Sequence, residues 1–132
     1  MNAEYLADIR HFISTFKNSA EPINFFRPIT LRPVELASLL EKLEGIYDEP
    51  KLPLKKNVVL IGSKVVILDM FDYTEMSLII SLPDDSDPSK GKISVLSPLG
   101  SSLLGRERGE TFAIFYGNRM NRFRITSIDQ QP

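Results

Sequence analysis

The chain has 132 residues, of which 42% are hydrophobic and 25% are charged, and its formal net charge is −1 at pH 7. This composition is typical of one globular domain or two very small ones, and the balanced charge gives no overall attraction to nucleic acid or anionic membranes. The absence of cysteine excludes disulfides, thiolate zinc sites and cysteine nucleophiles. There is no signal-like N-terminus, and no apolar run approaches the roughly 20 residues that span a bilayer, so we expect a cytoplasmic protein without membrane contact.

Two amphipathic helices are predicted at the start of the chain. The first covers residues 3–17 and has apolar side chains at helical spacing, namely Tyr5, Ile9, Phe12, Ile13 and Phe16. The second covers about 33–44, begins at Pro33 and is expected to stop at Gly45. Its apolar stripe consists of Leu36, Leu39, Leu40 and Leu43. Because two such stripes usually bury each other, the pattern predicts a short helical hairpin.

A change of apolar period marks the next boundary. Residues 47–57 contain two prolines and mixed charge, which indicates a linker. We therefore divide the chain into a helical hairpin with its linker, residues 1–57, and a second domain, residues 58–132. The second domain has about five short strands with period-2 alternation, which predicts an α+β fold with one antiparallel sheet.

Individual strand positions follow from this alternation. Met76, Leu78, Ile80 and Leu82 are expected to share one face of a strand. Gly117 and Asn118 form a hairpin signal between the last two strands. The apolar side chains expected to share a face in this hairpin are Phe112, Ile114, Tyr116, Phe123 and Ile125.

The stretch from Ile93 to Glu110 combines a strand with a short helix. Ser97 can cap a helix through its hydroxyl group, and Pro98 then occupies the first helical position. Leu99 and Leu103 are four residues apart and can pack on the sheet, and Gly105 closes the turn. From local physics alone, this segment is a two-turn helix that closes one end of the sheet.

Five motifs in this half of the chain occur in a recognisable order. They are "GSKV" at 62–65, "DPSKGKIS" at 87–94, "SPLG" at 97–100, "LLG" at 103–105 and "GE" at 109–110. Together they resemble the C-terminal domain of the Gre-type bacterial transcription elongation factors over about residues 58–128. The resemblance implies an FKBP-like fold, an antiparallel sheet wrapped around one short helix.

The resemblance also implies a partner, bacterial RNA polymerase, bound at the rim of its secondary channel on the coiled coil of the β′ subunit. The docking loop would consist of Leu96, Ser97, Pro98, Leu99 and Gly100. Leu96 stands where the cleavage factors of the family usually have an aspartate. The loss of a charge-assisted contact there implies weaker docking, a more apolar contact, or an interaction module that no longer binds polymerase.

The N-terminal half bears on catalysis. Cleavage-stimulating members of the family carry acidic residues at the tip of a long coiled coil, where they help to hold a magnesium ion. Here the expected tip, residues 18–28, has Glu21 as its only acid, beside Phe25 and Phe26, and one carboxylate is a poor magnesium site. We therefore expect no catalytic residue, no metal and no cofactor. This layout is closest to the Rnk type, in which a Gre-like domain carries a short helical hairpin.

The leading hypothesis is a non-enzymatic regulator of transcription elongation that docks on polymerase and acts by occupancy. One alternative is a weak transcript-cleavage or anti-arrest factor. An alternative from another class is an FKBP-like peptidyl-prolyl isomerase with an aromatic pocket formed by Phe112, Phe115, Tyr116 and Phe123. Fold analogy alone does not carry that activity.

Three further groups of residues resemble parts of known functional sites. Asp85, Asp87 and Ser89 alternate like calcium ligands, but the twelfth loop position, where a bidentate glutamate is needed, is Leu96. His11 is the only histidine, and we interpret it as an ordinary helix-surface residue. On the last hairpin, Arg119, Arg122 and Arg124 could contact nucleic-acid phosphates, although alternating arginines usually form a solvated strand face.

Overall fold

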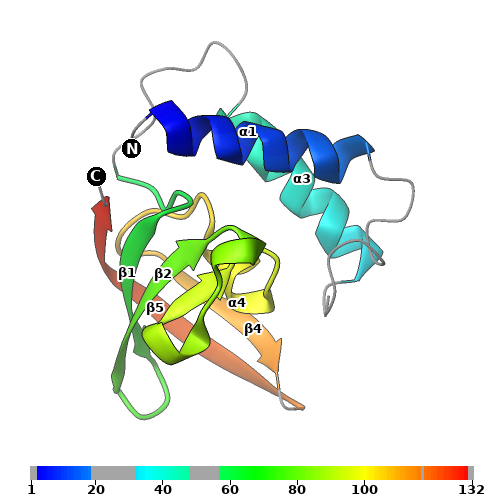
Figure 1. The fold of residues 1–132 in the computed structure, drawn as a ribbon. Helices are drawn as coiled ribbons and strands as arrows, with labels where there is room; N and C mark the ends of the chain where they lie inside the picture. The colour runs from blue at the N-terminus through cyan, green and yellow to red at the C-terminus, as the bar shows by residue number, and fades with distance from the viewer. Residues whose placement is uncertain (1–2, 19–31, 48–56, 117, 131–132) are drawn as a thin grey trace.

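The computed structural model describes residues 3–18, 32–47, 57–116 and 118–130. The predicted tip residues Glu21, Phe25 and Phe26, and most of the predicted linker, lie outside these ranges. Two helices come first, followed by a sheet that carries one short helix, so the α+β class is confirmed (Figure 1). The elements are α1 (Ala3–Asn18), α3 (Pro33–Tyr47), β1 (Ser63–Asp69), β2 (Glu75–Ser81), β3 (Lys92–Ser94), α4 (Pro98–Leu103), β4 (Thr111–Tyr116) and β5 (Arg119–Gln130).

Helix α3 extends beyond the expected stop at Gly45 and ends at Tyr47. The reason is tertiary, because Tyr47 is buried and its hydroxyl group accepts a hydrogen bond of 2.8 Å from the backbone N–H of Ile61. This anchor holds the last helical turn against the sheet domain. None of the described helices is long and apolar enough to cross a membrane.

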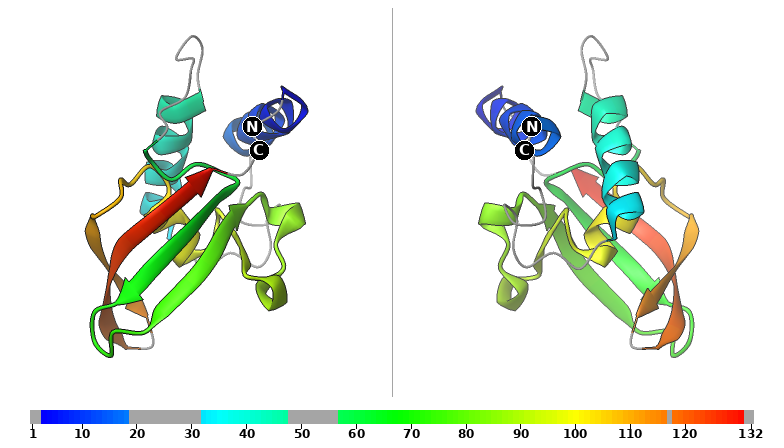
Figure 2. Two further views of the ribbon diagram at one scale, coloured as in Figure 1. Left: turned by 90° about the vertical axis from the view of Figure 1, so that its left-hand side faces the viewer. Right: turned by 90° about the vertical axis from the view of Figure 1, so that its right-hand side faces the viewer.

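Helices α1 and α3 cross one another, as Figures 1 and 2 show, so their contact is confined to part of each helix. Phe12 and Phe16 of α1 are buried in the shared core, with ring centroids 5.8 Å apart. An ion pair of 3.0 Å joins Lys17 Nζ to Glu44 Oε2 and links the C-terminal turn of α1 to α3. The helical region is therefore a packed pair of helices rather than an extended coiled coil.

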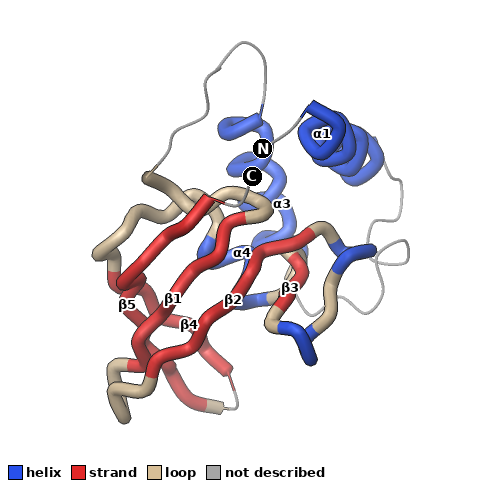
Figure 3. Tube along the Cα trace, turned by 60° about the vertical axis from the view of Figure 1, so that its left-hand side comes forward, coloured by secondary structure: helices blue, strands red, loops and turns tan. Residues whose placement is uncertain are grey.

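The five strands form a curled mixed sheet in the order β3-β2-β1-β5-β4 (Figure 3). The pairs β2–β1, β1–β5 and β5–β4 are antiparallel, as expected, whereas the edge strand β3 is parallel to β2. The chain between β2 and β3 passes through two 3-10 turns, η1 (Pro83–Asp85) and η2 (Pro88–Lys90), and this detour brings β3 back in the same direction as β2. A register shift between Val66 and Ile67 adds local twist to β1, and Figure 3 shows the curl of the sheet.

One hydrophobic core runs from the two long helices through α4 into the sheet. The predicted inward positions Leu78, Ile80, Phe112 and Ile125 are buried. Met76 is an exception with an exposed fraction of 46%, because β2 begins at the end of the sheet that lies farthest from the helices (Figure 1). Burial therefore follows the position of the helices along each strand as well as the period-2 pattern.

Candidate partner-binding site

The short helix α4 starts with the predicted cap. The Ser97 hydroxyl oxygen accepts a hydrogen bond of 3.0 Å from the Gly100 N–H and donates one of 2.7 Å to the Ser94 carbonyl oxygen. Pro98 follows at the first helical position, where its missing N–H has no helical partner to lose. The cap therefore fixes the direction in which the loop leaves β3.

Gly100 lies at the tightest point of this loop. A Cβ atom there would collide with the carbonyl oxygen of Ser94, so the backbones of α4 and β3 approach more closely than any other residue allows. Leu96 is also buried, at 5% exposure, within the core. Leu96 is buried and Gly100 has no side chain, so these two residues shape the backbone of the loop and do not offer a side chain to a partner.

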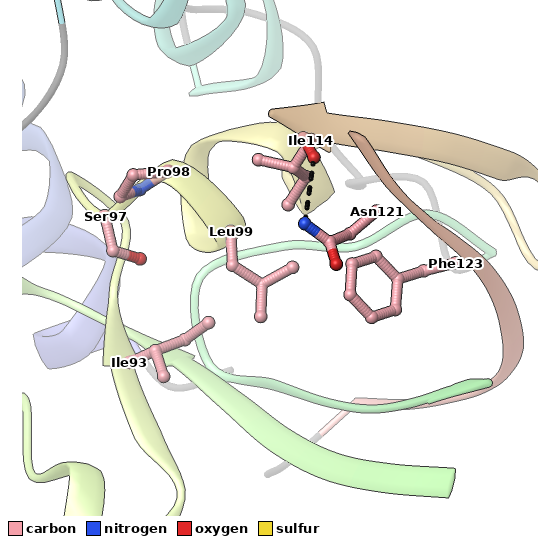
Figure 4. Close-up of a pocket in the computed structure, with 7 residues that line it drawn as sticks. All are labelled: Ile93, Ser97, Pro98, Leu99, Ile114, Asn121 and Phe123. Atoms are coloured by element: carbon pink, nitrogen blue, oxygen red, sulfur yellow. Dashed lines mark hydrogen bonds between the residues drawn. The ribbon is translucent and has the colours of Figure 1, made fainter. Parts of the chain in front are cut away.

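Ser97, Pro98 and Leu99 line a pocket of about 350 Å³ on the inner face of the sheet (Figure 4). The other lining residues come from three strands and are Ile93, Ile114, Asn121 and Phe123. Five of the seven side chains are apolar, counting Pro98. A pocket of this size and composition suits an apolar side chain or a helix end of a partner protein.

Asn121 is the polar group at the rim of the pocket. Its Nδ2 atom lies 3.5 Å from the Ile114 carbonyl oxygen, at the outer limit of a hydrogen bond, and Ile114 and Asn121 are opposite one another in the β4–β5 register. Sequence reasoning missed Asn121 and did not connect Ile114 and Phe123 with the Ser-Pro loop. The available signal was a polar residue at an inward position of β5, two residues before the apolar Phe123.

Helix α3 supports the far end of α4. Lys42 Nζ donates a hydrogen bond of 2.8 Å to the Ser101 carbonyl oxygen. Burial and, to a smaller extent, the nearby positive charge of Arg106 lower the pKa of Lys42 to about 8, while Glu110 opposes the shift. Arg106 itself pairs with Glu110 at 3.3 Å. Lys42 therefore links α3 to α4 by a polar contact, in addition to the core that the two helices share.

The comparison with known families agrees with this geometry. Residues 54–130 match the model of the family described as transcription elongation factor GreA/GreB, C-terminal domain. That range contains the whole sheet, the Ser-Pro loop and every residue that lines the pocket. The chain belongs to the GreA/GreB C-terminal domain family.

Curated members of the GreA/GreB family match beyond this domain. GreA of Thermodesulfovibrio yellowstonii is 32% identical over 93 residues, which cover 70% of this chain and 59% of the relative. GreA of Helicobacter pylori strain Shi470 is 35% identical over 102 residues, which cover 77% of this chain and 60% of the relative. The chain thus spans about three fifths of the length of these GreA proteins.

Solved structures of GreA/GreB-type proteins share the fold. A prokaryotic transcription elongation factor GreA/GreB from Nitrosomonas europaea superimposes with a TM-score of 0.68 at 23% identity, over 93% of both chains. Gfh1 of Thermus aquaticus gives a TM-score of 0.52 at 17% identity, over 96% of this chain and 90% of its own. At these identities the likeness concerns the fold alone.

The aromatic residues of this GreA/GreB-type domain separate into different places. Phe123 lines the pocket, and its ring centroid lies 5.6 Å from that of Phe112, which is buried in the core. Phe115 is 66% exposed on the opposite face of the sheet. The side chain of Tyr116 lies outside the described residues. The structure therefore does not bring the four aromatics together.

The remaining candidate ligands lie apart from the pocket. Asp87 accepts a hydrogen bond of 2.6 Å from Ser89 Oγ beside η2, and the part of the chain that is described holds no group of three metal-binding side chains. His11 and Asp85 line a second cavity, of about 400 Å³, between α1 and η1. Of the hairpin arginines, Arg122 and Arg124 lie on the outer side of the sheet, opposite Ala113 and Thr111, whereas Arg119 lies on the pocket side and donates a hydrogen bond of 3.2 Å to Asn121 Oδ1.

Proposed function

We propose that this protein binds bacterial RNA polymerase through the pocket and loop formed by Ser97, Pro98 and Leu99, and that it regulates elongation by occupying the rim of the secondary channel. The carrying observation is the capped loop beside an apolar pocket, in a chain of the GreA/GreB family whose curated relatives are named transcription elongation factors. The coiled coil of the β′ subunit is the expected contact. The end of this coiled coil would place an apolar side chain in the pocket, and such a contact would explain why the pocket is lined mainly by apolar residues.

The occupancy mechanism is supported by the segment between the two long helices. Residues 19–31 contain one carboxylate, Glu21, whereas a magnesium ion needs several oxygen ligands. The helices themselves have 16 and 15 residues, or about 23 Å each at 1.5 Å per residue. Because α1 and α3 cross, they form a compact body at the side of the sheet. Such a body fits a blocking role better than delivery of an acidic tip.

The same pocket bears on the alternative of a prolyl isomerase. Among the described residues that line it, Phe123 is the one aromatic, and the loop side consists of Ser97, Pro98 and Leu99. This is a poorer match to an aromatic proline pocket than to a protein-docking surface. We therefore favour a binding function over an enzymatic one.

The test is binding to core bacterial RNA polymerase by the Pro98→Ala and Ser97→Asp variants. Alanine is accepted at the first helical position and aspartate is a good helix cap, so both variants keep α4 folded. Pro98→Ala should weaken binding about 5- to 30-fold, because truncating an anchor side chain costs about 1–2 kcal/mol. Ser97→Asp places a charge at an apolar contact and should weaken it further.

Pro88→Ala is the matched control, because Pro88 also starts a short helical turn but is exposed and lies outside the pocket. It should bind like the unmodified chain. Absence of micromolar binding by the unmodified chain, or equal effects of the two proline substitutions, would contradict the proposal. Rapid shortening of transcripts in stalled complexes would instead identify a cleavage factor, and turnover of proline peptides an isomerase.

A further inference from the structure

The part of the β4–β5 hairpin nearest its turn carries positive charge only. Between Thr111 and Thr126 there are three arginines and no acidic residue, although the whole chain has a net charge of −1. Arg122 and Arg124 occupy alternate positions of β5, opposite Ala113 and Thr111 of β4. Their side chains therefore lie on the same face of the sheet, about 7 Å apart along the strand.

This face is the reverse of the one that bears the pocket. Phe112 and Phe123 form the intervening register pair and point inward, so the arginines point outward. Figure 2 shows α3 and α4 on the inner side, while β5, β1 and β2 present their outer side to the viewer on the left. Neither Arg122 nor Arg124 forms an ion pair with a described carboxylate. Glu75 lies two strands away, across Leu68.

Exposed aromatic and sulfur-containing side chains accompany the arginines. Phe115 and Met120 face one another across the hairpin on the outer side and are 66% and 56% exposed. Arg119 belongs to the other face of the hairpin, because its Nε donates a hydrogen bond of 3.2 Å to Asn121 Oδ1 beside the pocket. We call Phe115, Met120, Arg122 and Arg124 the outer arginine surface.

The aromatic ring of this surface is carried by a regular backbone. Phe115 belongs to the β4–β5 strand pair and lies opposite Met120. Because this backbone is already ordered, stacking of a flat ligand would order the side chain alone.

We propose that the outer arginine surface binds single-stranded nucleic acid. Guanidinium groups on alternate strand positions suit successive phosphates, and the exposed ring of Phe115 suits the stacking of an unpaired base. An acidic peptide would use the arginines but would leave Phe115 without a role. The site is separate from the polymerase pocket, because the two occupy opposite faces of one hairpin, so both partners could be held at once.

The test is fluorescence anisotropy with a labelled single-stranded RNA of about 15 nucleotides, the full chain, and a salt series. The unmodified chain should bind, and the Arg122→Gln/Arg124→Gln double variant should bind at least tenfold more weakly. The slope of log K against log salt should fall by about 1.4, as expected for two lost phosphate contacts on a single strand. Phe115→Leu keeps the apolar bulk but removes the aromatic face, and should weaken binding several-fold.

The matched control is Lys90→Gln/Lys92→Gln, which removes the same charge from alternate positions beside β3, away from the hairpin. It should leave binding unchanged, and so should Pro98→Ala. No binding at low salt, or an equal loss in both double variants, would overturn the proposal. Equal affinity for a duplex, or for polyglutamate with the same arginine dependence, would overturn it in favour of another partner. The assay contains no polymerase, so failure of this proposal can be distinguished from failure of the proposed polymerase binding.

Discussion

Gly100→Ala should destabilise the protein, although alanine is normally the better helix residue. The new Cβ would meet the Ser94 carbonyl oxygen and would lie 3.0 Å from Ser97 Oγ. The first turn of α4 must then move away from β3, which stretches the hydrogen bonds of the Ser97 cap. A lost cap costs about 1 kcal/mol and overpacking about 1–3 kcal/mol, against a gain of about 1 kcal/mol in helix propensity. The expected net loss in unfolding free energy is about 1–3 kcal/mol.

Gly45→Ala is the matched comparison, since it makes the same chemical change within a helix. Gly45 is exposed in α3, and a Cβ atom there would have no atom within 4 Å. Only the propensity gain of up to about 1 kcal/mol remains, so this variant should be stabilised. The two alanine variants should therefore differ by about 2–4 kcal/mol, with opposite signs relative to the unmodified chain.

Urea denaturation followed by circular dichroism measures both variants, because the chain has no tryptophan to report by fluorescence. In thermal melts, a chain of this length should shift by about 3–4 °C per kcal/mol, so Gly100→Ala should melt about 3–12 °C lower. A Gly100→Ala variant as stable as the unmodified chain would show that the Ser94 carbonyl does not constrain α4. Equal shifts for the two variants would mean the same.

Two other predictions concern the junction between the helices and the sheet domain. The pKa of Lys42 is about 8 in the folded chain and 10.5 when unfolded, so the unfolded chain holds more protons in that window and stability should rise with pH. Solvent screening reduces this rise in unfolding free energy to about 1–2 kcal/mol. Urea titrations between pH 8 and 10 should show the rise in the unmodified chain but not in Lys42→Met. Above pH 10 the rise is opposed by Tyr5, because burial raises the pKa of its hydroxyl group to about 12. Tyr47→Phe removes the acceptor of the Ile61 N–H and should lower the unfolding free energy by about 1–3 kcal/mol, whereas Tyr73→Phe, at 68% exposure, should change it by less than about 0.5 kcal/mol. The same pH dependence in Lys42→Met and in the unmodified chain would contradict the first prediction. Equal losses in the two tyrosine variants would contradict the second.

Local patterns predicted the elements of this fold well, because their causes are local. The Ser97 cap and the proline at the first position of α4 follow from side-chain chemistry within four residues. The alternation of β4 and β5 placed Phe112 and Ile125 in the core. Helix α3 ran past Gly45 because a distant backbone N–H holds Tyr47, and no local pattern contains that contact.

The candidate site was predicted only in part, for the same reason. Its loop residues are contiguous, but Ile114 and Phe123 reach the pocket through strand register, and Asn121 through the opposite partner of Ile114. Leu96 is buried in the core, whereas its neighbour Ser97 lines the pocket. A reader of the sequence sees Leu96 beside Ser97 and expects both to face the partner.

The alternation of β5 has an evolutionary consequence. Neighbouring residues such as Phe123 and Arg124 belong to opposite faces, so each surface can vary by substitution without disturbing the other. An inserted or deleted residue within this strand would move every following side chain to the opposite face of the sheet. Selection acting on either surface should therefore keep the length of the hairpin constant while it allows substitutions at individual positions.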